Sequence, residues 1–235
     1  MTPTSEAGSR PQWGISHAVG LVVGAHLVLL IGGGLVIGIG GWSDPYPITA
    51  QVSALIPFWI FSLVGSVLLT QRLGGGPVHD LGLELRPLDV PLGIVVGLGM
   101  QFAVLPVIYW PLLRLFGSDV DALEKASREL ADSAPGTVGT ILFVVMACLM
   151  APVVEEVLYR GVLMRALGRV SPAWGVVGSS LVFGALHFQP LQFIGLALFG
   201  VSAALLAQRS GRLGPAVVAH VAFNAGTVVK LLIER

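Results

Sequence analysis

Two adjacent carboxylates stand inside a stretch of chain that is otherwise apolar. Glu155 and Glu156 directly follow the run Met150-Ala-Pro-Val-Val154, and Arg160 comes four residues after Glu156. A charged side chain at the centre of a bilayer costs about 3 kcal/mol or more, so such residues normally face a partner or a wet cavity and mark a function. A carboxylate in a confined site of low polarity is a stronger base than one in water, which suits it to take a proton from a water molecule near neutral pH.

The spacing pairs Arg160 with Glu156 rather than with Glu155. Residues four apart lie on one helical face, and the order acid before base is the favourable one. Glu155 points about 100° away from Glu156. Glu156 therefore has two interpretations, a structural ion pair or a part of the active site. Glu155 has no such partner, and because an unpaired buried carboxylate is too costly to keep without a purpose, it is the sharper catalytic candidate.

Two more polar pairs occur in apolar helices further along the chain. Phe183-Gly-Ala-Leu-His187 places an aromatic ring one turn before a histidine, and His220-Val-Ala-Phe-Asn224 places a histidine and an amide on one face. Each polar side chain carries an insertion cost, so their occurrence together in consecutive helices indicates a common site. The candidate site residues are Glu155, Glu156, Arg160, His187, His220 and Asn224.

Distances along the chain predict which of these residues can meet. Glu155 lies sixteen residues before Ser171 and His187 sixteen after it, and Ser171 is the natural turn between two helices. In an antiparallel hairpin both side chains would therefore lie about 24 Å from the turn. His220 would lie about 15 Å shallower if its helices were straight, so either these helices tilt or the turn before them sits deeper.

The composition shows that charged residues are rare in this chain, which makes each of them informative. Of 235 residues, 54% are hydrophobic and 11% are charged, the net charge is zero and the mean hydropathy is +0.86. A soluble domain has about a quarter of its residues charged, so the chain is predicted to be a polytopic membrane protein. Without a basic excess, nucleic acid is excluded as a partner. The one cysteine, Cys148, cannot form an internal disulfide.

Six stretches of the chain are free of Asp, Glu, Lys and Arg and long enough to cross a bilayer. They comprise residues 14–43, 45–71, 90–113, 133–154, 170–208 and 213–229. A transmembrane helix needs about 20 apolar residues, so the fifth stretch is too long for one helix. His187-Phe-Gln-Pro190 lies near its middle, where a proline would end one helix and open the next. We therefore predict an all-α transmembrane bundle of about seven spans.

The chain is predicted to form one membrane domain, residues 14–235, after a flexible polar tail of residues 1–13. With the N-terminus in the cytoplasm, eight of the 13 Lys and Arg residues fall on the cytoplasmic side and five on the other. Cytoplasmic loops are enriched in basic residues. We therefore expect an integral protein of the bacterial cytoplasmic membrane with a cytoplasmic N-terminus.

A dense cluster of charges, residues 119–132, separates two of the spans. Apolar side chains recur in it at spacings of three and four, at Leu123, Ala126 and Leu130. This pattern predicts a short amphipathic helix that lies on the membrane surface. A solvated connector is the favoured role for it, with a lid over the substrate as the alternative.

The ordered motifs resemble the signature of a known family. Glu155-Glu156-Val-Leu-Tyr-Arg160, Phe183-Gly-Ala-Leu-His187 and His220-Val-Ala-Phe-Asn224 are similar to the E-E-x-x-x-R, F-x-x-x-H and H-x-x-x-N motifs of the CPBP (Abi) family of intramembrane proteases, which includes the type II CAAX prenyl endopeptidases. The resemblance covers residues 137–233, the expected catalytic core. In addition, Leu81-Gly-Leu-Glu-Leu-Arg-Pro87 is similar to a segment that often precedes a span in bacterial members.

The resemblance implies an endopeptidase that hydrolyses peptide bonds within the bilayer. Glu155 would be the general base that activates water, and His187 would position that water or the substrate carbonyl. His220 and Asn224 would donate hydrogen bonds to the developing oxyanion, where donors fixed in a dry site have their largest effect. Glu156, paired with Arg160, would orient the other site residues without contacting the substrate itself.

The need for a metal is open at this point. Bacterial members of the family are commonly described as metalloproteases, yet this chain lacks the His-Glu-x-x-His helix of a zinc protease. Three side-chain ligands and a water suffice for catalytic zinc, and the residues that could supply them are Glu155, Glu156, His187 and His220. We favour a metal-free glutamate mechanism, with zinc as the alternative.

Two other functional classes compete with the protease. The first is a non-proteolytic immunity or partner-binding membrane protein of the same fold, which would keep the polar cluster for structure. The second is a transporter, but the chain lacks the internal two-fold repeat that many transporters have. The expected partners are membrane lipid and a peptide or membrane-protein substrate, and whether that substrate is lipidated is left open by the sequence.

Overall fold

The structure of the chain is a computed structural model that describes residues 11–234. Those residues form helices joined by short turns, with no strand among them, which confirms the predicted all-α class. The predicted tail, residues 1–13, lies mostly outside the described residues. At its end, however, Trp13 is buried and its Nε1 donates a hydrogen bond of 3.4 Å to Asp80. The packed part of the chain thus begins before the predicted boundary, because the indole finds both cover and a partner for its N–H.

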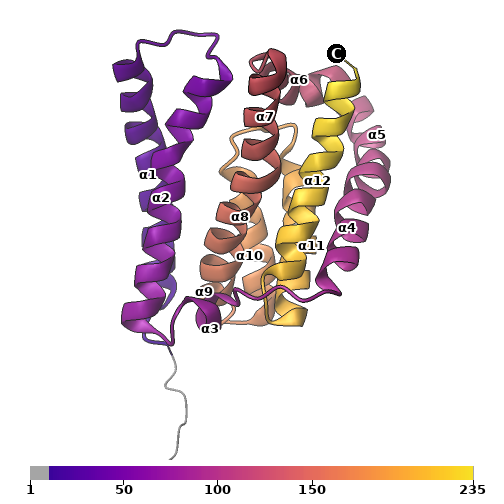
Figure 1. The fold of residues 1–235 in the computed structure, drawn as a ribbon. Coiled ribbons are helices and arrows are strands. Elements are labelled where there is room, and N and C mark those ends of the chain that lie inside the picture. The colour runs from indigo at the N-terminus through magenta and orange to yellow at the C-terminus, as the bar shows by residue number, and fades with distance from the viewer. Residues whose placement is uncertain (1–10, 235) are drawn as a thin grey trace, which may run out of the picture.

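The first two spans form a helical hairpin at one side of the molecule (Figure 1). Helix α1 comprises Ile15–Gly40 and helix α2 Ile48–Leu73. Both are long and apolar enough to cross a membrane. Small residues let the two backbones come close, since a side chain at Gly33 would lie 3.0 Å from the main-chain oxygen of Ala54.

A short helix and an extended strap follow the hairpin. Helix α3 comprises Pro77–Leu81 and ends at Gly82, whose φ of 69° favours glycine. Residues 82–88 then cross the lower end of the bundle in Figure 1, and we call this segment the strap. It leads into a continuous helix made of α4 (Asp89–Gly99), the π-helical turn η1 (Met100–Val104) and α5 (Leu105–Phe116).

The charged connector is a helix, α6, that comprises Val120–Asp132 and lies across the upper end of the bundle (Figure 1). The side chain of Asp119 caps its first turn by accepting a hydrogen bond from the N–H of Ala122 at 2.8 Å. This confirms the predicted amphipathic surface helix. The buried face differs slightly from the prediction, because Leu123, Leu130 and Ala131 turn inward whereas Ala126 is exposed.

The helix that carries the two glutamates is longer than predicted. It runs through α7 (Gly136–Val145), η2 (Met146–Met150), α8 (Ala151–Glu155), η3 (Glu156–Met164) and α9 (Arg165–Leu167) as one span. The prediction ended this span at residue 154, because the charge-free run stops there. The helix continues because the charges that follow are neutralised inside the protein, as described below. Two of its segments, η2 and η3, are π-helical, a geometry often found at functional sites.

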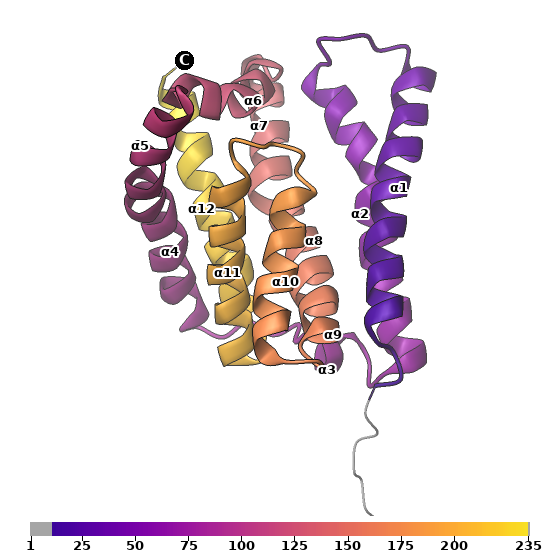
Figure 2. The same ribbon diagram turned by 180° about the vertical axis from the view of Figure 1, so that it is seen from behind.

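Three more helices complete the bundle. They are α10 (Pro172–Ala185), α11 (Phe193–Ser210) and α12 (Gly214–Ile233). The predicted division of the fifth stretch near Pro190 is confirmed, because α10 and α11 form a hairpin whose turn contains this residue (Figure 2). Within residues 11–234, six helices have the length and composition of membrane spans, and α10 is a seventh, shorter apolar helix.

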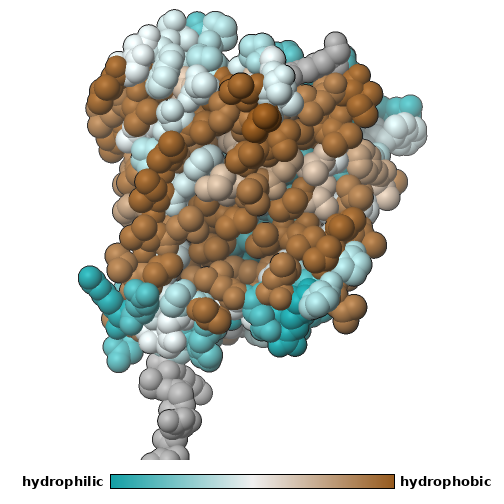
Figure 3. All heavy atoms as spheres, in the orientation of Figure 1, coloured by the Kyte–Doolittle hydropathy of each residue, from teal (hydrophilic) through white to brown (hydrophobic). Residues whose placement is uncertain are grey.

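The surface has the distribution of polarity expected of a membrane protein. Figure 3 shows apolar side chains over the middle of one face, with hydrophilic residues gathered at the lower end. Many large apolar side chains are exposed, among them Leu30 and Ile39 of α1 and Val107 of α5. Exposed apolar side chains on helices of this length are stable in contact with the acyl chains of lipids.

Candidate active site

The two glutamates lie where the fourth span changes from α-helix to π-helix. Glu155 ends α8 and Glu156 begins η3. As predicted, the two side chains have different surroundings. The side chain of Glu156 is fully buried, whereas that of Glu155 is 17% exposed.

Glu156 is the centre of a buried charge network. Its Oε1 accepts a hydrogen bond from Arg160 Nη1 at 2.8 Å and lies 2.8 Å from His220 Nδ1. Its Oε2 is buried and has no partner among the described residues. The predicted pair with Arg160 is therefore present, and it extends to a histidine from a different helix.

Arg160 is also fully buried and holds two helices together. Besides its bond to Glu156, it donates from Nη2 to the main-chain oxygen of Gly200 on α11 at 3.1 Å. The lack of a side chain at Gly200 makes room for this contact, since an added carbon would lie 3.2 Å from Nη2. The guanidinium stacks 4.5 Å from the centre of the Phe183 ring. The guanidinium charge, which would be costly in lipid, is thus stabilised by Glu156, by the main-chain oxygen of Gly200 and by the ring of Phe183.

Glu155 is the carboxylate without a hydrogen bond. Its Oε2 lies 3.9 Å from His187 Nε2 and 3.8 Å from His220 Nε2. Both distances exceed that of a direct hydrogen bond. Within residues 11–234 no donor forms a hydrogen bond with this carboxylate, so of the two glutamates it is the one whose oxygens remain available.

The orientation of each histidine ring follows from its second nitrogen. His187 Nδ1 lies 2.7 Å from the main-chain oxygen of Phe183, which can only accept, so Nδ1 carries a proton. In the neutral ring, Nε2 is then an acceptor and faces Glu155. The same holds for His220, because its Nδ1 faces the carboxylate of Glu156. Two imidazole nitrogens and one carboxylate oxygen therefore converge on one place.

Asn224 lies one helical turn beyond His220 and has a different partner. Its Nδ2 donates to the main-chain oxygen of Ala147 at 2.8 Å. This oxygen has lost its helical donor, because the N–H of Ala151 bonds to Met146 instead and the next residue, Pro152, has no N–H. Among the described residues no side-chain hydrogen bond joins Asn224 to Glu155, His187 or His220, and the second N–H of its amide is left for another acceptor.

The strap contacts the start of the helix that carries His220. Straight helices would leave His220 about 15 Å shallower than Glu155, but in the structure His220 Nε2 lies 3.8 Å from Glu155 Oε2. The turn before α12 is buried beneath the strap, because the N–H of Leu213 donates to Gly82 at 2.7 Å and that of Gly214 to Glu84 at 3.1 Å. These bonds hold the start of α12 against the strap.

An ion pair between Arg212 and Asp89 stabilises the start of α12. Arg212 donates to Asp89 from Nη2 at 2.6 Å and from Nε at 3.0 Å, and the N–H of Arg86 donates to the same carboxylate at 2.8 Å. These hydrogen bonds raise the pKa of the Arg212 guanidinium above its ordinary value. Gly214 permits the close fit, because a side chain there would lie 2.6 Å from Asp89 Oδ2.

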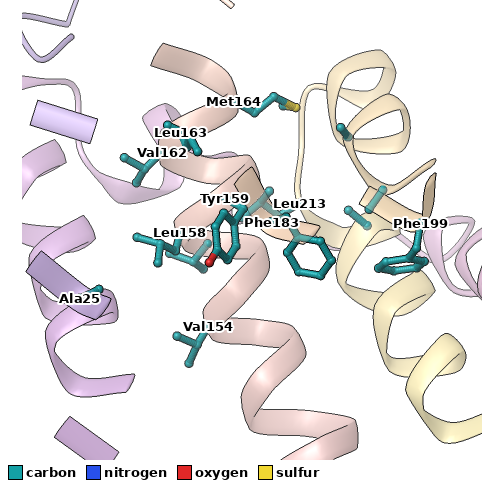
Figure 4. Packing of buried hydrophobic residues seen from close by; sticks show 14 of the residues in the cluster. Ala25, Val154, Leu158, Tyr159, Val162, Leu163, Met164, Phe183, Phe199 and Leu213 are labelled. Carbon is teal, nitrogen blue, oxygen red and sulfur yellow. The ribbon is translucent and has the colours of Figure 1, made fainter. Parts of the chain in front are cut away.

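Phe183 is a central residue to which the sequence alone gave no role. Its buried ring makes edge contacts with Tyr159, His187 and His220 at centroid distances of 5.3, 4.6 and 5.7 Å. Figure 4 shows it between Tyr159 and Phe199. The motif spacing of Phe183 and His187 was the available signal for this contact.

His26 of α1 also reaches the neighbourhood of the site. Its Nδ1 lies 2.8 Å from the main-chain oxygen of Val22, so its Nε2 is an acceptor for the hydroxyl of Tyr159 at 3.2 Å. Tyr159 is one turn from Glu155 on the same helix. This bond connects the first helical hairpin to the helix that carries the glutamates.

Of the four residues suggested for zinc, Glu156 is engaged by other side chains. The Oε1 of Glu156 is occupied by Arg160 and His220, and His220 uses Nδ1 for that contact. No group of three or more His, Cys, Asp or Glu side chains in residues 11–234 has the arrangement of a metal site.

The region that carries the candidate residues matches a known protein family. Residues 137–226 match the model of a family described as type II CAAX prenyl endopeptidase Rce1-like. The matched segment contains all three motifs and all six candidate residues. Comparisons with curated proteins and with solved structures gave no match. The match confirms the predicted CPBP resemblance at the level of a membrane protease family. Residues 137–226 of this chain are therefore similar to the Rce1-like family of type II CAAX prenyl endopeptidases.

Proposed function

We propose that this protein is an intramembrane endopeptidase in which Glu155 activates water. The observation that carries the proposal is the arrangement of Glu155 Oε2 between the Nε2 atoms of His187 and His220, at 3.9 and 3.8 Å. A water molecule that bridges such distances can donate to the carboxylate and to a neutral imidazole at once. Its oxygen is then held beside the base, as general base catalysis requires.

The reaction proceeds by addition and elimination at the peptide carbonyl. Glu155 takes a proton from water while the water oxygen bonds to the carbonyl carbon, and the carbonyl oxygen becomes an oxyanion. When the C–N bond breaks, the protonated Glu155 gives its proton to the leaving amine. The products are a carboxylic acid and an amine, and no other reactant is needed.

The oxyanion requires donors, and the geometry limits what His220 can offer. Its Nδ1–H is directed to Glu156, so it donates from Nε2 only as an imidazolium. Asn224 supplies the second donor from the N–H that Ala147 does not use.

Glu156 and Arg160 position these groups without reacting. Glu156 fixes the ring of His220 by a hydrogen bond, and Arg160 neutralises the carboxylate and connects it to α11 through Gly200. A catalytic histidine whose orientation is set by a carboxylate is a recurrent arrangement in hydrolases.

The experiment is peptide cleavage by the purified full chain in detergent. Wild type, Glu155→Ala, His187→Ala and a surface control, Glu129→Gln, are incubated with a peptide library that includes prenylated and unprenylated members. We expect cleavage by the wild type and the control, and its loss in the other two variants. Unchanged cleavage by Glu155→Ala would overturn the general-base role. Preference for the prenylated members would identify lipidated substrates.

Two further arms separate the alternatives. Addition of a chelator leaves activity unchanged if Glu155 acts without a metal. Loss on chelation and recovery with zinc would replace the metal-free mechanism with a metal-dependent one. Absence of cleavage by the wild type across the library would favour a non-proteolytic immunity or binding protein of the same fold.

A further inference from the structure

A second polar site lies far from the glutamates, at the end of the bundle that carries the N-terminus. A cavity of about 430 Å³ opens there between the ends of several helices. Three candidate spans begin or end beside it, α1 at Ile15, the fourth span at Leu167 and α11 at Ser210. The cavity therefore lies at the level where helices leave the hydrocarbon and lipid headgroups begin.

Two arginines of the same helix end line this cavity. Arg165 donates from Nη2 to the main-chain oxygen of Gly211 at 2.8 Å. Arg169 stacks 4.7 Å from the ring of Trp13 and bonds to the main-chain oxygens of Pro11 and Trp13. In the part of the chain that the structure describes, neither guanidinium forms an ion pair with a carboxylate.

The one carboxylate in the cavity is already satisfied by other donors. Asp80 is buried and lies 2.8 Å from both the N–H of Gly75 and Nδ1 of His79, and it accepts from Trp13 Nε1 at 3.4 Å. Asp80 therefore makes no hydrogen bond to either arginine. The lining carries two guanidinium groups and one carboxylate, so a positive charge remains for a ligand.

We propose that this cavity binds the phosphate of an anionic phospholipid headgroup. The planar, forked guanidinium is the side chain best matched to phosphate oxygens, and two of them one turn apart can hold one phosphate together. Basic pockets between helices at a membrane surface are suited to anionic headgroups. Met164, Pro172 and Ala207 supply an apolar wall beside the arginines, against which the glycerol and upper acyl chain of the lipid rest.

The test measures binding rather than proteolysis, so its outcome is independent of the proposed reaction. The purified full chain in detergent is titrated with dioctanoyl phosphatidylglycerol, dioctanoyl phosphatidylcholine or inorganic phosphate, and bound ligand is counted by native mass spectrometry. The test variant is Arg165→Gln/Arg169→Gln. The matched control is Arg72→Gln/Arg209→Gln, which removes the same charge from exposed arginines outside the cavity lining. Arg169→Gln alone leaves the Arg165 bond to Gly211 intact and guards against loss of fold.

We expect phosphatidylglycerol to bind the wild type and the control equally. The test variant should bind it at least about ten-fold more weakly, and Arg169→Gln should fall between them. Equal binding by the test variant and the control would overturn the proposal. So would equal affinity for phosphatidylcholine, which lacks the net charge. Arginine-dependent binding of inorganic phosphate as tight as that of the lipid would identify a free-phosphate site instead.

Discussion

At the scale of single residues, the two neighbouring glutamates have separate tasks because their surroundings differ. Glu156 is buried, paired with Arg160 and bonded to His220, whereas Glu155 accepts no hydrogen bond from the described residues. The sequence predicted the first pair, since a spacing of four places both side chains on one face. It could not predict the bond to His220, because this depends on how deep a distant helix lies.

The buried pair gives a prediction about stability. Glu156→Gln leaves the guanidinium of Arg160 buried without its carboxylate, so we expect a loss of about 3–5 kcal/mol in the free energy of unfolding. The double variant Glu156→Gln/Arg160→Met removes both charges and should be more stable than Glu156→Gln alone. Thermal unfolding in detergent, followed by tryptophan fluorescence, is measured for both single variants, Glu156→Gln and Arg160→Met, and for the double variant. A double variant whose loss equals the sum of the single losses would contradict the pairing.

The ring of His220 gives a prediction about catalysis. Its Nε2 faces Glu155 and its Nδ1 faces Glu156. The variant His220→Gln keeps an N–H donor but cannot contact both glutamates as the ring does, so we expect a lower kcat in the cleavage assay. A folded His220→Gln protein with the kcat of the wild type would contradict the role given to this ring.

At the scale of helices, the contact between α4 and α12 decides where His220 and Asn224 lie. The apolar stretches predicted the helices and the division near Pro190, because lipid permits few charges. They did not predict that the fourth span continues beyond residue 154, because its later charges are neutralised by Glu156 and Arg160. Nor did they predict the contacts by which the strap and the pair of Asp89 with Arg212 hold the start of α12.

Two glycines on α4 provide a matched test of this contact. A side chain at Gly97 would collide with the main-chain oxygen of Ala219 on α12, whereas one at Gly99 would meet nothing within 4 Å. Gly97→Ala should therefore shift α12, lower the free energy of unfolding by about 1–3 kcal/mol and reduce kcat. Gly99→Ala should leave both unchanged or raise stability slightly. Equal effects of the two changes on Tm and kcat would contradict the account.

At the scale of the whole molecule, the described chain begins at one end of the bundle and finishes at the other (Figure 1). In the described residues, the six long spans and the shorter helix α10 pass through the bundle seven times, so the chain ends on the side opposite to the one where it begins. The basic residues favour a cytoplasmic N-terminus. The six candidate residues come from three separate segments of the chain, and the helices packed around them complete the site.

The orientation predicts how fused reporters behave. With the N-terminus in the cytoplasm, alkaline phosphatase joined after the last residue should be exported and active, and a fluorescent protein at the same place should stay dark. The same fluorescent protein joined to the N-terminus should be bright. The opposite pattern in intact bacterial cells would reverse the proposed orientation.

The central claim is that the carboxylate of Glu155 is the base that activates water. It is tested most directly by the kcat of Glu155→Gln, which preserves the shape of the side chain and removes its basicity, measured beside Glu129→Gln on the exposed surface helix. Removal of a general base should lower kcat by about 10²–10⁴-fold while Tm and the control remain as in the wild type. A correctly folded Glu155→Gln protein with the kcat of the wild type would contradict the account.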